Sequence, residues 1–419
     1  MMLNACTIGP VPTIVTAPPG AVTSIIPADA LVIKNGKVFD GTGAPAIPDG
    51  AVVIVKNKIA AVGRAPDFSI PPEARVIDAA GGTILPGIID SHVHEANSAL
   101  VRQFYFLRQG VTTVCDLGSP LTALTPNSFD AGYGSTARVF RSGPIINPPQ
   151  GYPGDGEFLY PVNNIDEARQ AANLLISRGA DMLKLAFEPG NPKVPWQTPQ
   201  KVSIPNLDLP QVKAIVAQAR ARGKLVRVHL GTVEMLDLAL DGGVDVIEHV
   251  PLPRLDQIDL TSEPFGKLSF DYEAQLARII KQNIVLVPTL DFIITWCENR
   301  AETPERKALC AKYMQTPVHR FYEMGGVIAL GDDSGYAFRT GMPLAEMRRL
   351  SAIGMSPTEV LQAATRRAAR VCGHGDELGT LEPGKFADVI VVPGDATLNI
   401  EALNQVDFVI IDGKVAVSK

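Results

Sequence analysis

The stretch Ile84-Leu85-Pro86-Gly87-Ile88-Ile89-Asp90-Ser91-His92-Val93-His94 carries two histidines, one residue apart, directly after an apolar run. The run is short, rich in β-branched residues and interrupted by Gly and Pro, which predicts a buried strand. Side chains at positions i and i+2 of a strand point to the same face, so both imidazoles can converge on one point. Imidazole is the commonest protein ligand for zinc-like metals, and the pair therefore suggests a metal site at a strand end.

Strand and helix patterns alternate through the middle of the chain. Helical runs such as 165–178 and 210–222 separate several of the strand candidates. Eight buried strands are predicted, at residues 87–92, 111–116, 137–142, 182–187, 225–230, 244–249, 284–290 and 327–330. Eight strand and helix units over about 250 residues are typical of a (β/α)8 TIM-like barrel, whose parallel strands read as continuous apolar runs. A doubly wound sheet alternates in the same way but usually with fewer strands, so we expect an α/β barrel.

Short strand-like runs separated by turn signals occupy both ends of the chain. The run 31–38 contains Asn35-Gly36, a dipeptide typical of tight hairpins. Similar runs follow at 51–62 and 75–78 and return at 388–392 and 408–415. We therefore expect a small β-sandwich built from both chain ends. The predicted division is an N-terminal extension at 1–27, a composite β-sandwich at 28–85 plus 380–419, and the barrel at 86–379.

The composition limits the partners. Of 419 residues, 46% are hydrophobic and 20% charged, the net charge is −6, and no basic cluster occurs. A sizeable core is expected, while nucleic acid and anionic membranes are not expected as partners. No apolar run approaches the roughly 18 residues that cross a bilayer. A small-molecule substrate is the expected partner, and a homo-oligomer remains open.

The five cysteines are Cys6, Cys115, Cys297, Cys310 and Cys372. Their number is odd and no Cys-x-x-Cys spacing occurs, so we interpret them as reduced thiols of a cytoplasmic protein. Residues 3–6, Leu-Asn-Ala-Cys, resemble a bacterial lipobox, although no charged or apolar region precedes them. An exported or lipid-anchored form therefore stays open.

Polar side chains end several of the predicted strands, where the active sites of barrels lie. The chain has six histidines, and four of them fall at these ends. A single such histidine would be interpreted as a hydrogen-bonded core residue, but four together predict a metal site. His319 and His374 lack this placement and are expected outside the site. The candidate ligands are His92, His94, Lys184, His229, His249 and the aspartates Asp332 and Asp333.

Residues 31–36, 85–94, 378–388 and 411–414 together resemble the amidohydrolase superfamily, and the resemblance spans nearly the whole chain. Residues 179–184 and 361–365 are most similar to its imidazolonepropionase-related group, which contains Xaa-Pro and Xaa-Arg/Lys dipeptidases. The resemblance implies a metal-dependent hydrolase of amide C–N bonds that acts on a dipeptide, an N-acyl amino acid or a related amide.

The resemblance also implies roles for the ligands. His92 and His94 would bind the more buried of two divalent metal ions, most often zinc, and His229 and His249 the more exposed one. Lys184, carboxylated on its amine by carbon dioxide, would bridge both. An unmodified lysine with a pKa of about 10.4 is a poor neutral ligand, and buried lysine is rare unless paired. The alternative is a lysine that extends its amine from the strand end into solvent.

Family members usually read Gly-Thr-Asp where this chain reads Gly331-Asp332-Asp333. The resemblance makes Asp333 a metal ligand and proton shuttle, with His249 as the second catalytic residue. A metal-bound hydroxide would attack the amide carbonyl, and Asp333 would accept its proton and return it to the leaving amine. Asp332 stands in the threonine position, either with a role at the site or simply solvated.

Two other interpretations are weighed against this one. Mononuclear cyclic amidohydrolases or deaminases of the same fold typically show His-x-x-Glu after the fifth strand, and the run from His229 to Thr232 lacks that glutamate. A non-catalytic relative would have lost ligands, and none is missing here. Substrate contacts are less defined. Tyr152 stands where relatives often carry histidine, and the candidates for binding a substrate carboxylate are Arg141, Arg254 and Arg339.

Overall fold

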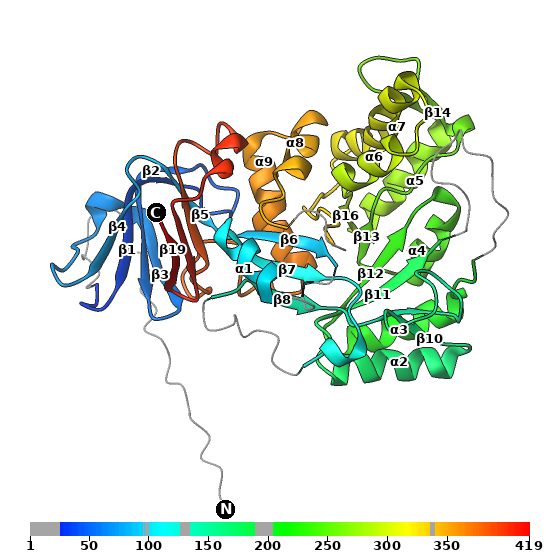
Figure 1. Ribbon diagram of the computed structural model, residues 1–419, viewed down its shortest axis with the longest axis horizontal. Helices are drawn as coiled ribbons and strands as arrows, with labels where there is room; N and C mark the ends of the chain where they lie inside the picture. The colour runs from blue at the N-terminus through cyan, green and yellow to red at the C-terminus, as the bar shows by residue number, and fades with distance from the viewer. Residues whose placement is uncertain (1–25, 95, 97–99, 126–134, 189–203, 336–339) are drawn as a thin grey trace, which may run out of the picture.

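The computed structural model describes residues 26–94, 96, 100–125, 135–188, 204–335 and 340–419. Most of the predicted extension at 1–27 lies outside the described residues, as do Cys6 and Arg339. The first and last strands of the chain lie together on the left of Figure 1, and the α/β part occupies the rest of the view.

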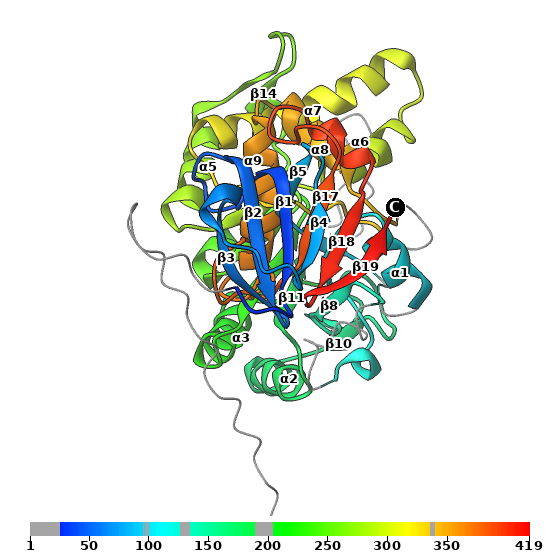
Figure 2. The ribbon, with the colours of Figure 1, turned by 90° about the vertical axis from the view of Figure 1, so that its left-hand side faces the viewer.

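One mixed sheet draws its strands from both ends of the chain (Figure 2). Its order is β19-β18-β17-β5-β1-β2-β3, with β4 beside β1. The two chain ends meet where Leu85 of β5 pairs antiparallel with Ile390 of β17. The strands are β1 (Leu31–Val38), β2 (Ile47–Val55), β3 (Lys58–Arg64), β4 (Arg75–Asp78), β5 (Thr83–Pro86), β17 (Val389–Val392), β18 (Phe408–Ile411) and β19 (Lys414–Ser418).

The hairpin expected at Asn35-Gly36 is wrong. These residues lie inside the continuous strand β1, and the register against β2 shifts on both sides of Gly36. Asn35 takes a left-handed φ of 61°, which asparagine tolerates, and so absorbs the bulge. A Cβ at Gly36 would lie 2.8 Å from the Cβ of Ala79. The dipeptide therefore serves close packing within a strand rather than a turn between two strands.

Two parallel sheets make up the middle of the chain. The first runs β6-β7-β8, and the second runs β10-β9-β11-β12-β13-β16. The largest hydrophobic cluster packs these strands against the surrounding helices. The strands are β6 (Ile88–Val93), β7 (Val111–Asp116), β8 (Arg138–Arg141), β9 (Ile145–Asn147), β10 (Leu159–Pro161), β11 (Met182–Phe187), β12 (Leu225–Leu230), β13 (Val246–Glu248) and β16 (Val285–Val287).

Seven of the eight predicted buried strands are confirmed, and the eighth, at 327–330, is not a regular strand. Its residues connect the two parallel sheets through single contacts. Ile328 forms a parallel bridge with Leu286 of β16, and the Ser91 N–H of β6 donates to the Leu330 carbonyl at 3.1 Å. The α/β content and parallel sheets agree with the predicted fold class and are consistent with a barrel.

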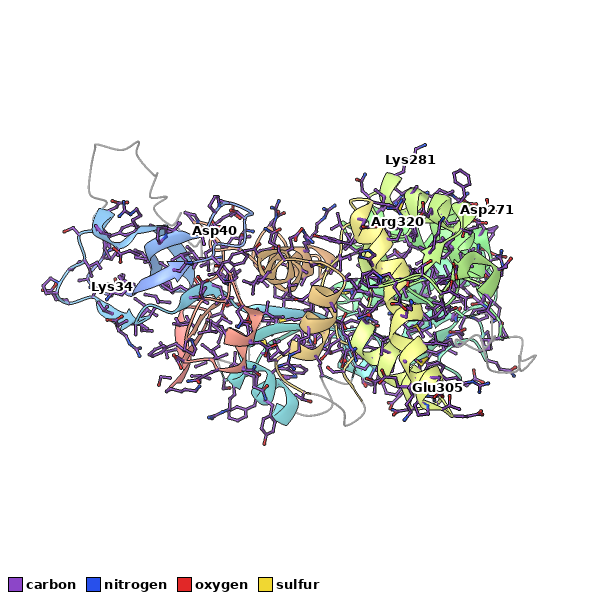
Figure 3. The ribbon with its side chains drawn as sticks, turned by 90° about the horizontal axis from the view of Figure 1, so that it is seen from above. Lys34, Asp40, Asp271, Lys281, Glu305 and Arg320 are labelled. Atoms are coloured by element: carbon purple, nitrogen blue, oxygen red, sulfur yellow. A yellow bond between two sulfur atoms is a disulfide. The ribbon has the colours of Figure 1, made fainter. Side chains whose placement is uncertain are left out.

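Helices cover the parallel strands, and the two predicted at 165–178 and 210–222 are confirmed to within one residue. Figure 3 shows α7, which carries Glu305 and Arg320, at the far side of the molecule from Lys34 and Asp40 of the mixed sheet. The described helices include none that is long and apolar enough to cross a membrane. They are α1 (Leu100–Arg108), α2 (Ile165–Ser177), α3 (Leu209–Ala221), α4 (Leu236–Gly242), α5 (Phe270–Lys281), α6 (Leu290–Glu298), α7 (Pro304–Glu323), α8 (Leu344–Ala352), α9 (Pro357–Gln362) and α10 (Ala368–Val371).

The expectation that the cysteines are reduced is wrong for four of the five. Cys297 and Cys310 form a disulfide between α6 and α7, with 5.8 Å between their Cα atoms. Cys115 and Cys372 form a second one, between residues 257 positions apart, with a Cα separation of 6.3 Å. All four are fully buried. Spacing along the sequence cannot reveal such pairs, because the fold alone brings them together.

Candidate metal centre

His92 and His94 lie on and just after the C-terminal end of β6, and Asp333 lies beside them. The Asp333 Oδ1 is 3.1 Å from Nε2 of His94 and 3.5 Å from Nε2 of His92. One ligand atom from each residue falls within 4.8 Å of the others, which is the spacing of a shared metal ion. His92 and His94 meet Asp333, which is far from them in the chain, because β6 and the segment 327–334 run side by side.

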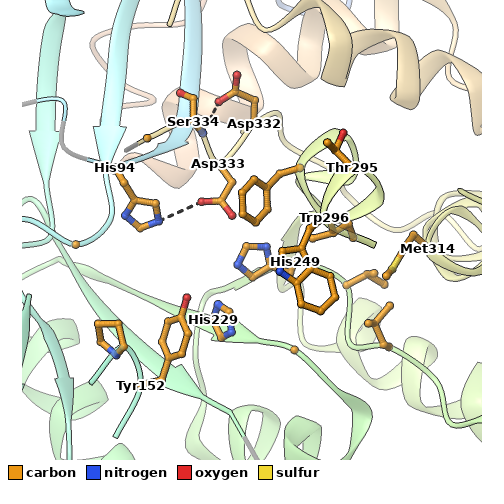
Figure 4. A pocket seen from close by; sticks show the side chains of 18 of the residues that line it. His94, Tyr152, His229, His249, Thr295, Trp296, Met314, Asp332, Asp333 and Ser334 are labelled. Carbon is orange, nitrogen blue, oxygen red and sulfur yellow. Dashed lines mark hydrogen bonds and ion pairs between the residues drawn. The ribbon is translucent and has the colours of Figure 1, made fainter. Parts of the chain in front are cut away.

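The two remaining predicted histidines come from neighbouring strands. His229 lies on β12, and His249 follows β13 directly. Their ring centroids are 4.6 Å apart, and the rings of His92 and His249 are 5.2 Å apart. Figure 4 shows His94, His229, His249 and Asp333 around one space. The structure therefore brings together all four histidines and the aspartate that the sequence singled out.

In three of the histidines, one ring nitrogen lies within hydrogen-bond distance of a side-chain oxygen. The residues that supply these oxygens were not among the predicted site residues. His92 Nδ1 lies 2.7 Å from Glu248 Oε2, and His249 Nδ1 lies 2.7 Å from Thr289 Oγ1. His229 Nε2 lies 3.2 Å from Glu188 Oε2. Such partners fix the tautomer and the orientation of metal-binding imidazoles. Glu188 alone had a sequence signal, because it lies four positions after Lys184 and so shares its strand face.

The Nε2 atom of His92 tests whether a metal fits. It is buried and has no hydrogen-bond partner within the described part of the chain, although it faces the other candidate ligands. Burial, with the nearby positive charge of Lys184, lowers the pKa of His92 to about 4, so the imidazole is neutral and its lone pair is available. Neutral imidazoles with a carboxylate are a donor set that suits zinc. The residues present therefore fit a divalent metal ion.

Three residues around this space have a left-handed backbone. The φ angles are 65° at His249, 48° at Thr289 and 55° at Asp333. Such a conformation is uncommon outside glycine and, for a β-branched residue such as Thr289, a true outlier. Strained backbone of this kind costs about 1–3 kcal/mol per residue and clusters at functional sites. Its concentration at two candidate ligands and the partner of one of them marks this region as functional.

Lys184 lies on β11 with 1% of its surface exposed. The described residues form no hydrogen bond or ion pair with its amine. The charges of Glu248, Arg227 and Asp333 act on it from nearby. Burial lowers the pKa of this lysine to about 8. The alternative in which the amine extends into solvent is therefore wrong.

Asp332 is buried, so the interpretation of a solvated residue is wrong. Its backbone N–H donates to Asp90 Oδ1 at 3.2 Å, and its own Oδ1 accepts from the Ser334 N–H at 2.8 Å. Burial raises the pKa of Asp332 to about 6 and, with the charge of Asp332 nearby, raises that of Asp90 well above its usual range. Of the two carboxyl groups, Asp90 is therefore the one that keeps its proton more strongly.

Arg227 forms a buried ion pair with Glu248, its Nε 2.6 Å from Oε1. Of the predicted carboxylate binders, Arg339 lies outside the described residues, and neither Arg141 nor Arg254 lines the cavity beside the histidines. The backbone N–H of Arg141 donates to Asp181 at 2.8 Å, and the Arg254 side chain pairs with Asp256. His319 stacks on Phe265 and His374 on Phe140, so both lie outside the site as expected.

A cavity of about 570 Å³ opens above the histidines. Tyr152 lines it and stacks on the ring of His229, with centroids 4.4 Å apart and an interplanar angle of 17°. The helices α6 and α7 form the opposite wall (Figure 4).

Comparison with known proteins gives a family match over most of the chain. The model of the family described as "Amidohydrolase family" matches residues 83–416. An imidazolonepropionase from Symbiobacterium thermophilum is 24% identical, over 87% of this chain and 91% of that protein.

Solved structures show the same architecture. A Xaa-Pro dipeptidase with methionine bound in its active site superimposes with a TM-score of 0.72, at 25% identity, over 92% of this chain and 99% of the other. The A. niger ochratoxinase superimposes with a TM-score of 0.72, at 19% identity, over 93% of this chain and 96% of the other.

Proposed function

The chain belongs to the amidohydrolase family and is a hydrolase of carbon–nitrogen bonds, and we propose that it cleaves an amide at the space enclosed by its four strand-end histidines. The observation that carries the proposal is the convergence of His92, His94, His229, His249 and Asp333 from separate strands. The Xaa-Pro dipeptidase and the imidazolonepropionase among the similar proteins support a dipeptide, an N-acyl amino acid or a related amide as substrate.

The ligand set would hold two divalent metal ions, of which zinc is the first candidate. His92, His94 and Asp333 would hold one, and His229 and His249 the other. Bound there, the ions would supply a nucleophile at neutral pH and polarise the substrate carbonyl. Glu248, Thr289 and Glu188 would keep the metal-facing nitrogens of three histidines deprotonated by accepting from the other ring nitrogen.

Lys184 would bridge the two ions as a carbamate. Its neutral amine attacks carbon dioxide, a C–N bond forms, and one proton leaves to solvent. A pKa of about 8 leaves about half of the amines neutral at pH 8, against well under one per cent for an ordinary lysine. The carbamate also replaces a buried amine, to which the described residues offer no hydrogen bond, with an anion suited to coordination.

Asp333 would move the proton of the reaction. In the metal-free protein with an unmodified Lys184, burial alone would raise the pKa of Asp333, but His92, His94 and Lys184 together hold it below the usual range, so the carboxylate is ionised and can accept a proton. From there the proton would pass to the leaving amine. Tyr152, stacked on His229 at the edge of the cavity, would contact the substrate.

The proposal also includes the architecture around the site. We infer that the two parallel sheets and the segment 327–334 close as an eight-stranded barrel over residues 86–379, because that segment contacts both β16 and β6. The mixed sheet over 28–85 plus 380–419 would form the separate β-sandwich domain.

The two disulfides bear on where the enzyme acts. Structural disulfides persist in oxidising compartments and are rare in the cytosol. We therefore favour an oxidising location over the cytoplasmic one that the cysteine spacing suggested.

A mononuclear cyclic amidohydrolase or deaminase is the second candidate. The tight cluster of possible ligands in the described residues comprises only His92, His94 and Asp333, which suffices for one metal. Metal stoichiometry distinguishes the two candidates, since the binuclear enzyme would bind two ions and the mononuclear one a single ion.

The test combines metal analysis with a screen of dipeptides, N-acyl amino acids and lactams. We expect two divalent ions per chain and amide hydrolysis that is lost in His249→Ala. The matched control is His319→Ala, since His319 stacks on Phe265 away from the site. A fully metal-loaded enzyme that instead releases ammonia from a heterocycle would establish the deaminase.

A further inference from the structure

The cavity has two chemically different walls. On one side lie His94, His229, His249 and Asp333. On the other, α6 contributes Phe292, Ile293 and Trp296, and α7 contributes Met314 (Figure 4). We call these last four residues the apolar wall. Phe292 and Trp296 are four positions apart on one helix, so their rings lie on the same face.

Charge is scarce away from the metal ligands. Apart from the histidines, Asp332 and Asp333, the only charged side chain among the described residues that line the cavity is Arg300. Its guanidinium lies 4.1 Å from the centre of the Trp296 ring, and its Nη1 donates to the Trp296 carbonyl at 3.2 Å. Arg300 is exposed, so it covers the outer edge of the apolar wall rather than its interior. Among the described lining residues, only Arg300 at the outer edge could meet a carboxylate on the substrate, and a charge seated deeper against the apolar wall would be costly to desolvate.

We propose that this enzyme takes amides whose acyl or amine part carries a neutral aromatic or branched aliphatic group, seated against Phe292, Trp296 and Met314. The inference rests on the proposed amide hydrolysis and names its substrate class. Ligand pockets are typically apolar with a few polar groups that fix orientation, and here the polar groups are the metal ligands on the opposite wall. The apolar wall is thus the determinant of specificity.

The wall is preformed, because three contacts fix α6. The disulfide between Cys297 and Cys310 joins α6 to α7, one residue from Trp296 and four from Met314. The buried carboxylate of Glu346 accepts from the first two N–H groups of α6, at 2.9 Å from Leu290 and 2.7 Å from Asp291. Thr289, directly before the helix, meets the candidate ligand His249. Covalent and buried polar contacts therefore set the distance between the candidate metal ligands and the apolar wall.

The test uses two series of neutral and charged amides with zinc-loaded enzyme. In the first, acetamide, 3-methylbutanamide, phenylacetamide and succinamate differ only in the acyl group, and ammonia release is measured. In the second, N-methyl-, N-benzyl- and N-carboxymethyl-acetamide differ only in the amine, and acetate release is measured. In at least one series we expect kcat/KM for the apolar member to exceed that of the smallest by about tenfold or more, and the anionic member to fall below both.

Variants assign that preference to the wall. In Phe292→Ala and in Trp296→Phe the ratio of kcat/KM between apolar and smallest amide should fall several-fold, chiefly through KM. The control is Phe270→Ala, because Phe270 is 85% exposed on α5 and does not line the cavity. Preference for the anionic amides, or an apolar preference that both wall variants retain, would overturn the inference.

A binding measurement separates this inference from the proposed function. Calorimetry with 4-phenylbutan-1-ol, a neutral aromatic ligand without an amide, should show binding that weakens about tenfold or more in Phe292→Ala and not in Phe270→Ala. If the alcohol binds in this way but no amide is hydrolysed, the proposed function fails and the apolar subsite stands. If amides are hydrolysed but neither preference nor alcohol binding depends on the wall, the subsite fails and the function stands.

Discussion

Nδ1 of His92 lies 2.7 Å from Oε2 of Glu248, and this contact decides which nitrogen of His92 faces the candidate metal centre. Both side chains are fully buried, and the other oxygen of Glu248 accepts from Nε of Arg227 at 2.6 Å. Burial by itself would raise the pKa of Glu248, but Arg227, Lys184 and His92 hold it well below its usual range, so it is an anion. An anion at Nδ1 requires the proton there and leaves Nε2 free to coordinate.

Glu248→Gln should therefore weaken metal binding as well as the fold. We expect zinc affinity to fall about 10- to 100-fold, because the partner that orients His92 loses its charge. We expect the free energy of unfolding of the metal-free protein to fall by about 3 kcal/mol, because Arg227 loses its buried counter-ion. Competition with a zinc chelator and denaturant titration measure the two effects.

Glu302→Gln is the matched control for that variant. Glu302 pairs with Arg306 at 2.8 Å on the surface, where an ion pair contributes about 0–1 kcal/mol. Zinc affinity that is equal in wild type and Glu248→Gln, with both proteins folded, would contradict the positioning role of Glu248.

Gly331→Ala should displace His92. A Cβ at this position would lie 2.6 Å from the Cβ of His92 and 2.7 Å from Cγ1 of Val287, which no structure tolerates without movement. We expect the free energy of unfolding to fall by about 1–3 kcal/mol. We expect zinc affinity to fall by a larger fraction of its wild-type value than the stability does, because the ligand His92 itself moves.

The control is Gly375→Ala, where the nearest atom to an added Cβ is at an ordinary 3.4 Å. Thermal unfolding and zinc titration of both variants give the comparison. Wild-type zinc affinity in Gly331→Ala would show that the close approach of the two segments is not required for the site.

Much of this site was predictable because the C-terminal ends of neighbouring parallel strands meet at the same edge of a sheet, so a residue's position along its strand predicts its position in space. The bounds predicted for β7, β11 and β12 are those observed. The partners Glu248 and Thr289 were missed because their contacts cross between strands, and no local pattern marks them. The segment 327–330 has a strand-like sequence but forms only a single bridge, between Ile328 and Leu286 of β16. The pairing of Cys115 with Cys372 depends on the fold in the same way.

The lowered pKa of Lys184 leads to a prediction about pH and carbon dioxide. Only the neutral amine reacts with carbon dioxide, and with a pKa of about 8 its fraction rises steeply between pH 7 and 9. We therefore expect the zinc-dependent activation of metal-free enzyme by bicarbonate to increase through this range, and ¹³C-labelled bicarbonate to give a carbamate signal in NMR spectra.

The same shift affects stability. The unfolded chain binds a proton on this lysine up to its ordinary pKa of 10.5, while the folded chain releases it near 8. Between these values the unfolded state binds more protons, so the metal-free, carbon dioxide-free protein should gain stability as pH rises. In Lys184→Met the bicarbonate effect and this pH-dependent gain should both disappear. A full bicarbonate response in that variant would assign the effect to another group.

The disulfide between Cys297 and Cys310 should stabilise the shape of the cavity as well as the fold. It closes a short loop, 13 positions apart, for which chain entropy predicts about 3 kcal/mol of stabilisation. In the double variant Cys297→Ser, Cys310→Ser we expect a lower free energy of unfolding by about that amount. Because α6 and α7 both supply the apolar wall, we also expect a smaller preference for apolar over small amides. Peptide mapping under non-reducing conditions should recover the Cys297 and Cys310 peptides linked in the wild type. Free thiols at both positions in fully active enzyme would show that the wall keeps its shape without the covalent link, and helix packing together with the Glu346 contacts would then suffice.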